Sequence, residues 1–438
     1  MGLGLVTDVY ELTMAASYLR RGMTQPATFS LFARKLPPSR GFLVAAGLED
    51  VLRLLQEVTF DETDLDWLAS EGFDAQTVDA FRDLRFTGDV WAIPEGHVVF
   101  PDEPVLEVTA PLPEAQLVET LVLNQVTYQT TITTKAARCR LAAVGRASLV
   151  DFSLRRTHGL EAGMAAARAG AIAGFVGTSN VAAAGQLGIP AVGTMAHAYI
   201  EAFPSERAAF IAFAEDFPDR TTFLVDTYDT LTGVGIAVEV AEAMHLGGRV
   251  GVRLDSGDLL TLSKETRRML DAAGRQDATI VASGGLDEYD VARLLDAGAP
   301  IDVFGVGTKV GVSADAPSLD TAYKLVEYAG RPVMKLSTGK QTRPGAKQVY
   351  RDDLAAGDVL ATRSEPAPLR GAPLLVQVMR GGELMHPAES VAVARDRLAA
   401  DLATLPAAAR QLDASAPEPV RVSDRLEALT REVAERHR

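Results

Sequence analysis

Charged side chains recur at the ends of short apolar runs in the middle of this chain. Arg253 and Asp255 stand two positions apart in RVGVRLDSGD, and side chains two apart on a strand share a face. A guanidinium fork beside a carboxylate suits a ligand with both an anionic group and hydroxyls; a buried structural ion pair is the alternative. Asp258 and Asp229 are unspecific candidates for a hard cation, because such ions often take one or two carboxylates and leave the other positions to phosphate oxygens.

Two glycine turns, ASGGL and GVGTK, follow apolar runs late in this region. Glycine lets backbone N–H groups approach an anion without a Cβ in the way. It also permits a tight turn between a strand and a helix, which is the structural alternative. Two such turns late in a barrel favour a phosphate site. The residues concerned are Ser283, Gly284, Gly285, Gly305, Gly307 and Thr308.

His197, in GTMAHAY, is a lone histidine after an apolar run, and such a residue is more often structural than catalytic. Asp226 ends the next run, and in a barrel it would lie close enough to hold one imidazole nitrogen. The other nitrogen would then be available as a nucleophile or base. His158, beside two arginines in RRTHG, is expected to be a residue of the pocket wall.

The runs that carry these residues repeat one rhythm: an apolar stretch, a small polar or glycine-bearing turn, then a helical segment. This rhythm indicates parallel strands linked by helices. Eight runs favour a closed α/β barrel with its active site at the C-terminal ends of the strands. An open doubly wound sheet is the alternative, but it usually has fewer units and one dominant glycine-rich first turn. The runs are ASLVDFS (147–153), IAGFVGTSN (172–180), PAVGTMAH (190–197), TTFLVDTYD (221–229), RVGVRLDSGD (249–258), ATIVASGG (278–285), IDVFGVGT (301–308) and, more weakly, AYKLVEY (322–328).

The rest of the chain divides around this barrel, which is predicted over residues 131–335. Residues 1–130 read as an α+β domain of antiparallel pieces, with a strand at FSLFARKL, a helix at LEDVLRLLQEV and a strand–turn–strand pattern from GDVWAIP onward. Strand and turn patterns within 336–400 would return to complete that domain. Residues 401–438 are predicted as a helical C-terminal tail.

Within this tail, DASAPEPV (413–420) is predicted to be a linker from its Pro, Ser and Ala content. Ser423 can cap a following helix. Leu426, Leu429 and Val433 would lie on one face of it, so the helix is expected to dock on the body or on a partner subunit.

Composition excludes several classes of protein. A chain of 438 residues with 47% hydrophobic residues can bury a sizeable core, and a net charge of -15 argues against nucleic acid as a partner. Cys139 is the single cysteine, so no multi-thiolate zinc or iron–sulfur site is expected and a reducing compartment fits. Neither a basic leader nor an apolar stretch of about 20 residues is present. We therefore expect a cytoplasmic protein with no membrane partner.

Taken in order, the motifs closely resemble those of the nicotinate phosphoribosyltransferase family, within the type II phosphoribosyltransferases. The resemblance spans about residues 7 to 330. It implies an irregular α/β barrel with an N-terminal α+β domain and a C-terminal extension, and a homodimer with active sites shared between subunits. The motifs are TDVYELTMAASY (7–18), FARKLPPSRGFLVAAGLED (32–50), DFSLRRTHG (151–159), GTSN (177–180), GTMAHAY (193–199), VDTYDT (225–230), VRLDSGD (252–258), SGGL (283–286) and FGVGTK (304–309).

The resemblance also implies a reaction and its participants. Members couple nicotinate and phosphoribosyl pyrophosphate to give nicotinate mononucleotide and pyrophosphate, usually with ATP hydrolysis and with magnesium, in NAD salvage. Phe152 and the partner-supplied Tyr10 would stack on the pyridine ring, Arg155 and Arg253 would surround its carboxylate, and Asp255 would hold the ribose hydroxyls. The glycine turns would cradle the 5′-phosphate, and Lys135 and Arg138 would face pyrophosphate. His197 matches the histidine that ATP phosphorylates, and Asp226 matches the carboxylate that positions it.

Other functions remain as alternatives. Nicotinamide-using relatives carry an aspartate where Ser179 stands here, and an aspartate would repel a carboxylate, so Ser179 favours nicotinate. A quinolinate enzyme would lack the ATP-linked histidine and be shorter. The run FLVDTYDTLTG resembles a phosphoribosyl pyrophosphate loop of another fold, but its acids are three apart. A ligand-sensing barrel would have no use for His197 beside Asp226.

Overall fold

A computed structural model describes the chain except for residues 1, 248–249, 369–370, 414–419 and 437–438. The described residues form two compact units. One consists of residues 1–131 together with 318–438, and the other of residues 132–317. In the part of the chain that the structure describes, no helix has both the length and the apolar character needed to cross a membrane.

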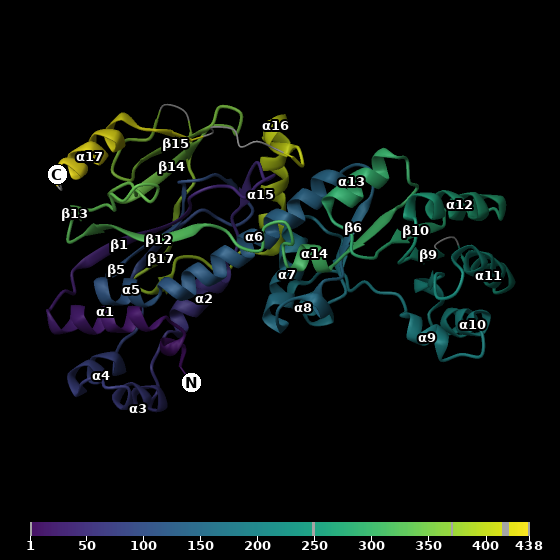
Figure 1. Cartoon of the computed structure of the whole chain (residues 1–438), viewed down its shortest axis with the longest axis horizontal. Helices are drawn as coiled ribbons and strands as arrows, with labels where there is room; N and C mark the ends of the chain where they lie inside the picture. Colours follow the sequence, from purple (N-terminus) through teal and green to yellow (C-terminus); the bar gives the residue numbers. More distant parts are fainter. Residues whose placement is uncertain (1, 248–249, 369–370, 414–419, 437–438) are drawn as a thin grey trace. The chain divides into compact units, whose positions relative to one another are not determined.

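The first unit is built on a seven-stranded antiparallel sheet with the order β13-β12-β1-β5-β3-β17-β18 (Figure 1). Strand β1 (Pro26–Ala33) pairs with β5 and β12 on its two sides, and β3 pairs with β17. Segments from both ends of the chain therefore share one sheet and one core. The other strands are β3 (Asp89–Ala92), β5 (Pro104–Pro111), β12 (Thr321–Tyr328), β13 (Arg331–Pro332), β17 (Val376–Arg380) and β18 (Glu383–Leu384).

Two smaller sheets complete this unit. One is the pair β2 (Leu43–Val44) and β4 (Val98–Val99), and the other has the order β16-β14-β15-β19. Strand β19 (Val420–Val422) pairs in parallel with β15, so the predicted helical tail is not wholly helical. The backbone hydrogen bonds of this short strand are met by a strand far away in the sequence, which a local helix signal cannot foresee. The remaining strands are β14 (Lys347–Arg351), β15 (Asp358–Thr362) and β16 (Ala372–Pro373).

The helices of this unit follow their apolar spacing and their caps. In α2 (Leu48–Glu57), Leu48, Val51, Leu52 and Leu55 are buried at the three- and four-residue spacing of one helix face. The helix predicted after Ser423 is confirmed, because the Ser423 hydroxyl accepts from the Leu426 N–H at 3.1 Å. Residues 414–419 of the predicted linker lie outside the described residues. The other helices are η1 (Leu3–Leu5), α1 (Val9–Arg20), α3 (Glu62–Ser70), α4 (Ala75–Arg82), α5 (Leu112–Leu117), α15 (Val391–Thr404), α16 (Ala407–Arg410) and α17 (Asp424–Glu435).

The second unit is built on a parallel sheet with the order β7-β6-β11-β10-β9-β8. The last strand in sequence, β11, pairs with the first, β6, as in a barrel, and Ala191 forms a parallel bridge to Thr178 beyond β7. The predicted irregular α/β barrel is thereby confirmed, whereas the expected closed ring of eight strands is not: among the described residues six strands form a curled sheet, and the run at 190–197 contributes only the Ala191 bridge. The strands are β6 (Ser148–Asp151), β7 (Gly177–Thr178), β8 (Thr222–Leu224), β9 (Gly251–Leu254), β10 (Thr279–Ala282) and β11 (Val303–Val306).

The eighth predicted run does not belong to this barrel. Residues 322–328 lie in β12 and pair antiparallel with β1 in the first unit. An apolar run is compatible with either sheet, and only its hydrogen-bonding partner decides between them.

Helices cover the outer side of the barrel strands (Figure 1). The core beneath them contains the fully buried rings of Phe210, Phe223 and Phe304. The long helix α6 (Glu119–Ala143) contributes residues to both units. The helical segments that follow it are η2 (Leu154–Arg156), α7 (Leu160–Ile172), α8 (Val181–Leu187), α9 (His197–Glu201), α10 (Glu206–Asp216), η3 (Pro218–Arg220), α11 (Thr230–Ala243), α12 (Leu259–Ala272), α13 (Glu288–Asp296) and α14 (Thr308–Gly311).

Candidate active site at the strand ends of the barrel

Arg253, Asp255 and Ser283 form one hydrogen-bonded cluster where β9 and β10 end. The Arg253 guanidinium donates to Asp255 Oδ1 and to Ser283 Oγ, both at 2.9 Å, and Ser283 donates to Asp255. Burial by itself would raise the pKa of Asp255, but the hydrogen bonds from Ser283 and Arg253 outweigh it and lower this pKa. The side chain of Asp255 is 28% exposed, so this ion pair stays within reach of a ligand.

Two further contacts fix the Arg253 side chain. Its Nη1 donates to Thr194 Oγ1 at 3.0 Å and to the Met195 carbonyl at 3.3 Å, and its guanidinium carbon lies 5.6 Å from the centre of the Phe152 ring. The predicted neighbours Arg253 and Phe152 are therefore together. Thr194 was not foreseen, although it stands in the GTMAHAY motif.

His197 lies between two carboxylates. Its Nε2 is 3.9 Å from both Asp226 Oδ1 and Asp255 Oδ2, and its Nδ1 is 3.1 Å from Thr227 Oγ1. The expected hydrogen bond between Asp226 and the imidazole is not formed at this distance, and Thr227 makes that contact instead. The sequence feature that could have indicated Thr227 is its position directly after Asp226 in VDTYDT.

Asp226 is held by its neighbours on the β9 side. Its Oδ2 accepts from the Asp255 N–H at 3.2 Å and from Ser256 Oγ at 2.6 Å. Its Oδ1 is buried and has no hydrogen-bond partner among the described residues. A buried acceptor without a donor is costly, and the imidazole of His197, whose Nε2 lies 3.9 Å away, is beside this oxygen.

Phe152 is enclosed by glycines of β11 and of the turn after it. A Cβ on Gly305 would come within 2.6 Å of the Phe152 ring, and one on Gly307 within 2.7 Å of its carbonyl oxygen. Gly284 has φ +108°, and its Cβ would lie 2.2 Å from the Asp255 carbonyl oxygen. These glycines are therefore required by packing, whatever they bind, whereas Gly285 (φ +72°) faces open space.

The turn after Gly307 presents backbone donors at the start of α14. Thr308 is its first residue, and first-turn N–H groups have no acceptor within their own helix. The predicted phosphate cradle remains a prediction.

Several polar residues at the strand ends cap the following helices. Asp229 accepts from the Thr232 N–H at 2.9 Å, Asp258 from the Leu260 N–H at 3.2 Å, and Asn180 from the Ala183 N–H at 3.2 Å. Capping accounts for these side chains without a ligand. Among the described residues, no group of three or more His, Cys, Asp or Glu side chains is arranged to hold a metal ion.

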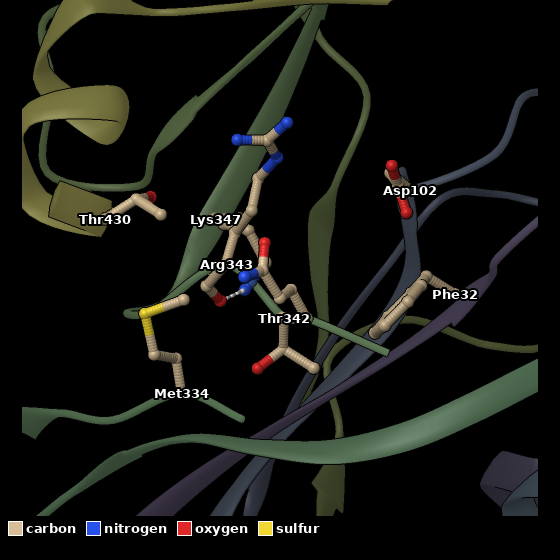
Figure 2. Close-up of a pocket in the computed structure, with 8 residues that line it drawn as sticks. Phe32, Asp102, Met334, Thr342, Arg343, Lys347 and Thr430 are labelled. Carbon is tan, nitrogen blue, oxygen red and sulfur yellow. Dashed lines mark hydrogen bonds between the residues drawn. The ribbon is translucent and has the colours of Figure 1, made fainter. Parts of the chain in front are cut away.

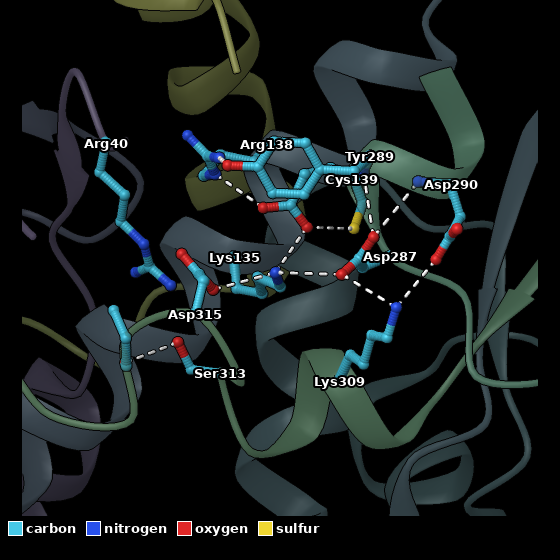
Figure 3. A network of polar contacts seen from close by, with 12 residues as sticks. Arg40, Lys135, Arg138, Cys139, Asp287, Tyr289, Asp290, Lys309, Ser313 and Asp315 are labelled. Carbon is cyan, nitrogen blue, oxygen red and sulfur yellow. Dashed lines mark hydrogen bonds and ion pairs between the residues drawn. The ribbon is translucent and has the colours of Figure 1, made fainter. Parts of the chain in front are cut away.

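Lys135 and Arg138 lie in a buried ion-pair network of the second unit (Figure 3). Lys135 Nζ is 2.6 Å from Glu288 and 2.9 Å from Asp315, and Arg138 Nε donates to Glu288 at 2.8 Å. Burial by itself would lower the pKa of Lys135, but these carboxylates outweigh it and raise the pKa. Both cations are thus already paired with protein carboxylates, and a contact with pyrophosphate stays a prediction.

The same network reaches the GVGTK turn. Asp287 Oδ2 lies 3.9 Å from Lys135 Nζ and 3.3 Å from Lys309 Nζ, and Lys309 also pairs with Asp290 at 2.9 Å. Figure 3 shows Lys135 and Lys309 on two sides of Asp287. Asp287 additionally caps α13, so one carboxylate ties α13 to the turn that contains Thr308.

The other predicted residues occupy more open positions. Arg155 is exposed in η2, Ser179 is partly buried after β7, and His158 is exposed. Tyr10 lies in α1 of the first unit with 46% of its surface exposed. An exposed tyrosine in this helix is accessible to another molecule.

A separate cavity of about 200 Å³ lies in the first unit (Figure 2). Phe32 and Asp102 line one side of it, and Arg343 and Lys347 lie across from them. The Lys347 ammonium donates to the carbonyls of Arg343 and Gly345. None of the residues predicted for the active site lines this cavity.

Comparisons with known proteins agree on one family. The model of the nicotinate phosphoribosyltransferase N-terminal domain matches residues 5–127, and that of the nicotinate phosphoribosyltransferase family matches residues 147–358. A nicotinate phosphoribosyltransferase of Mycobacterium tuberculosis is 49% identical over 431 residues, covering 96% of this chain and 92% of the relative. The crystal structure of human nicotinic acid phosphoribosyltransferase has a TM-score of 0.87 at 31% identity and covers 98% of this chain and 99% of that one. A Pyrococcus furiosus structure described as nicotinate-nucleotide pyrophosphorylase has a TM-score of 0.76 at 26% identity, with 92% and 95% coverage.

Proposed function

Because this chain belongs to the nicotinate phosphoribosyltransferase family, we propose that it joins nicotinate to phosphoribosyl pyrophosphate. The ring nitrogen of nicotinate forms a bond to ribose C1, the bond from C1 to the pyrophosphate oxygen breaks, and pyrophosphate leaves. The product, nicotinate mononucleotide, supplies NAD biosynthesis by salvage. The observation that carries this proposal is the Arg253–Asp255–Ser283 cluster, with His197 3.9 Å from Asp255.

The site groups suit the charges of these substrates. Arg253, with Arg155 on the turn that follows Phe152, offers guanidinium groups for the nicotinate carboxylate, and the Phe152 ring beside Arg253 offers an apolar face for the pyridine. The lowered pKa of Asp255 keeps it ionised at neutral pH, as acceptance of ribose hydroxyls requires. The attacking nitrogen already carries a lone pair, so the protein's task is to align the reactants and exclude water.

Positive charge grows on ribose as pyrophosphate departs, and a cation must stabilise the leaving group. Magnesium supplies that stabilisation when it is bound together with the substrates. The donor set fits such a shared ion, because Asp255 presents one partly exposed carboxylate and the phosphates bring the other oxygens. In this proposal the backbone of the two glycine turns holds the 5′-phosphate.

ATP enters the proposal through His197. Thr227 lies next to Nδ1, which leaves Nε2 for a phosphoryl group. Phosphorylation of His197 would couple ATP hydrolysis to substrate binding and product formation without taking part in the carbon–nitrogen bond. The proposed assembly is a homodimer in which Tyr10 of one subunit completes the pyridine site of the other.

The test is pyrophosphate release from phosphoribosyl pyrophosphate with nicotinate, nicotinamide or quinolinate as the second substrate. We expect efficient release with nicotinate alone among the three, and stimulation by ATP. Equal catalytic efficiency with nicotinamide would contradict the assignment, and binding without any release would favour a sensor.

Ser179 gives a sharper test of substrate choice. Ser179→Asp places a negative charge near the expected nicotinate carboxylate, which should weaken transition-state binding by about 1–3 kcal/mol in a partly desolvated site. The kcat/KM for nicotinate should fall accordingly. Ser179→Asn, similar in size but neutral, is the matched control and should cost less.

A further inference from the structure

Asp151, the last residue of β6, is a buried carboxylate to which the proposed mechanism gives no role. It is 2% exposed, and it lies directly opposite Thr178 in the parallel pairing of β6 with β7. Its Oδ2 accepts from Thr178 Oγ1 at 2.6 Å, and its Oδ1 accepts from the Ser153 N–H at 2.9 Å. A buried carboxylate must be hydrogen-bonded to be tolerated, and these two donors meet that need.

The same pair of side chains holds the backbone of two different turns. On the β6 side, the Ser153 N–H fixes the start of η2, which carries Arg155. On the β7 side, the Thr178 hydroxyl accepts from the Asn180 N–H at 3.0 Å, and the Asp151 carbonyl accepts from the Ser179 N–H at 2.8 Å. The two turns are therefore linked by one backbone bond, from the Ser179 N–H to the Asp151 carbonyl, and by the bond between the two side chains, which also holds the Ser153 and Asn180 N–H groups.

The residues between these anchors are those proposed to face the pyridine substrate. Phe152 stands between Asp151 and Ser153, and its N–H donates to the Val306 carbonyl at 2.7 Å. Gly305 lies so close to the Phe152 ring that the ring has no space to shift toward β11. The ring is thus held on the β11 side by packing, and the backbone on both sides of Phe152 is held by the bonds of Asp151.

We infer that Asp151 and Thr178 are positioning residues that fix the separation between the Phe152–Arg155 turn and the Ser179 turn, and so set the affinity for the pyridine substrate. This inference rests on the function proposed above. The hydroxyl of Thr178 donates its one proton to Asp151 and accepts from the Asn180 N–H, and at position 178 serine is the substitute that reproduces both bonds. The SGGL and GVGTK turns, which are proposed to bind phosphate, follow β10 and β11 instead of β6 and β7.

The deciding variant is Thr178→Val, which keeps the shape of the side chain and removes the hydroxyl. Small displacements of positioning groups have large kinetic effects, so we expect the KM for nicotinate to rise on the order of tenfold. The KM for phosphoribosyl pyrophosphate and kcat should stay within about twofold. Thr178→Ser, which retains the hydroxyl, should restore the nicotinate KM. Thr266→Val is the matched control, because Thr266 is fully buried in α12 and its hydroxyl has no partner among the described residues.

A purely structural role gives a different pattern. It predicts a lower free energy of unfolding with both KM values unchanged, or equal rises in both, and either result would overturn the inference. Asparagine at position 151 offers one acceptor oxygen for two donors. Combining Asp151→Asn, whose oxygen can still accept from the Ser153 N–H, with Thr178→Val should therefore raise the nicotinate KM no further than the more severe single variant, because the bond between the two side chains is already lost. Thr178→Ala offers the same measurement with a smaller side chain if valine prevents folding. Failure of the wild-type protein to use nicotinate would instead overturn the proposed function itself.

Discussion

His197 differs from an ordinary surface histidine in its immediate surroundings. Its side chain is 41% exposed, yet two carboxylates lie 3.9 Å from Nε2 and a threonine hydroxyl lies beside Nδ1. In the function proposed above, this exposure would let ATP reach the ring, and Thr227 would hold the ring from its Nδ1 side. These features suit a residue that carries a phosphoryl group.

His197→Ala should abolish nicotinate-stimulated ATP hydrolysis and leave slow transfer. Departure of pyrophosphate depends on cations and alignment, which this substitution leaves in place. Incubation with γ-labelled ATP should place acid-labile, base-stable label on the wild type and none on the variant. Wild-type labelling of the variant would remove His197 from the mechanism. Asp226→Asn should give an intermediate result.

At the scale of elements, helices α6 and α13 are joined by buried charges. Glu288 is fully buried and pairs with both Lys135 and Arg138. Glu288→Gln would leave two buried cations short of a counter-charge, so we expect a loss of about 3–5 kcal/mol in the free energy of unfolding. Urea denaturation measures it. Asp290→Asn, which alters a partly exposed pair with Lys309, should cost less than about 1 kcal/mol.

A second element-level prediction concerns Glu103, in the turn before β5. Burial, together with the Asp358 carboxylate of β15, raises the pKa of this fully buried side chain well above its usual range. The folded state therefore keeps a proton that the unfolded chain releases above about pH 4.5. The contribution of Glu103 to the free energy of unfolding is therefore complete below about pH 4.5. It is lost as the pH rises through the pKa that Glu103 has in the folded protein.

Glu103→Gln removes this titration and keeps a group that can donate to Asp358. The free energy of unfolding of the variant, relative to that of the wild type, should increase as the pH rises. The increase should be about 1.4 kcal/mol per pH unit between the pKa of Glu103 in the unfolded chain and its pKa in the folded protein. Urea denaturation between pH 4 and pH 9 checks the slope. A difference in stability that does not vary with pH would contradict the prediction.

At the scale of the whole molecule, Tyr10 and Asp255 belong to different compact units. If Tyr10 completes the site of a partner subunit, Tyr10→Ala and Asp255→Ala proteins are each inactive alone but complementary in a mixed dimer. Random exchange gives half mixed dimers with one intact site each, so about a quarter of wild-type activity should return. Activity assays after verified subunit exchange test this. No recovery would contradict the shared site.

Local signals in the sequence determined much of what the structure displays. The two-residue spacing of Arg253 and Asp255 placed both side chains on one face, because alternation along a strand is a property of the backbone itself. The helix after Ser423 was predicted from its capping residue and its apolar face, which are also local properties of the sequence. The ordered motifs, read as a set, predicted the barrel and the family.

Tertiary structure decided what depends on distant partners. Residues 322–328 joined β1 rather than the barrel, and Val420–Val422 joined β15, because strand hydrogen bonds are satisfied by segments far away in sequence. Thr227, rather than Asp226, makes the close contact with His197, because the packing of the two strand ends decides which neighbour comes within hydrogen-bond distance of the ring. Asp151 and Thr178 are 27 residues apart, and their pairing exists only once β6 and β7 lie side by side.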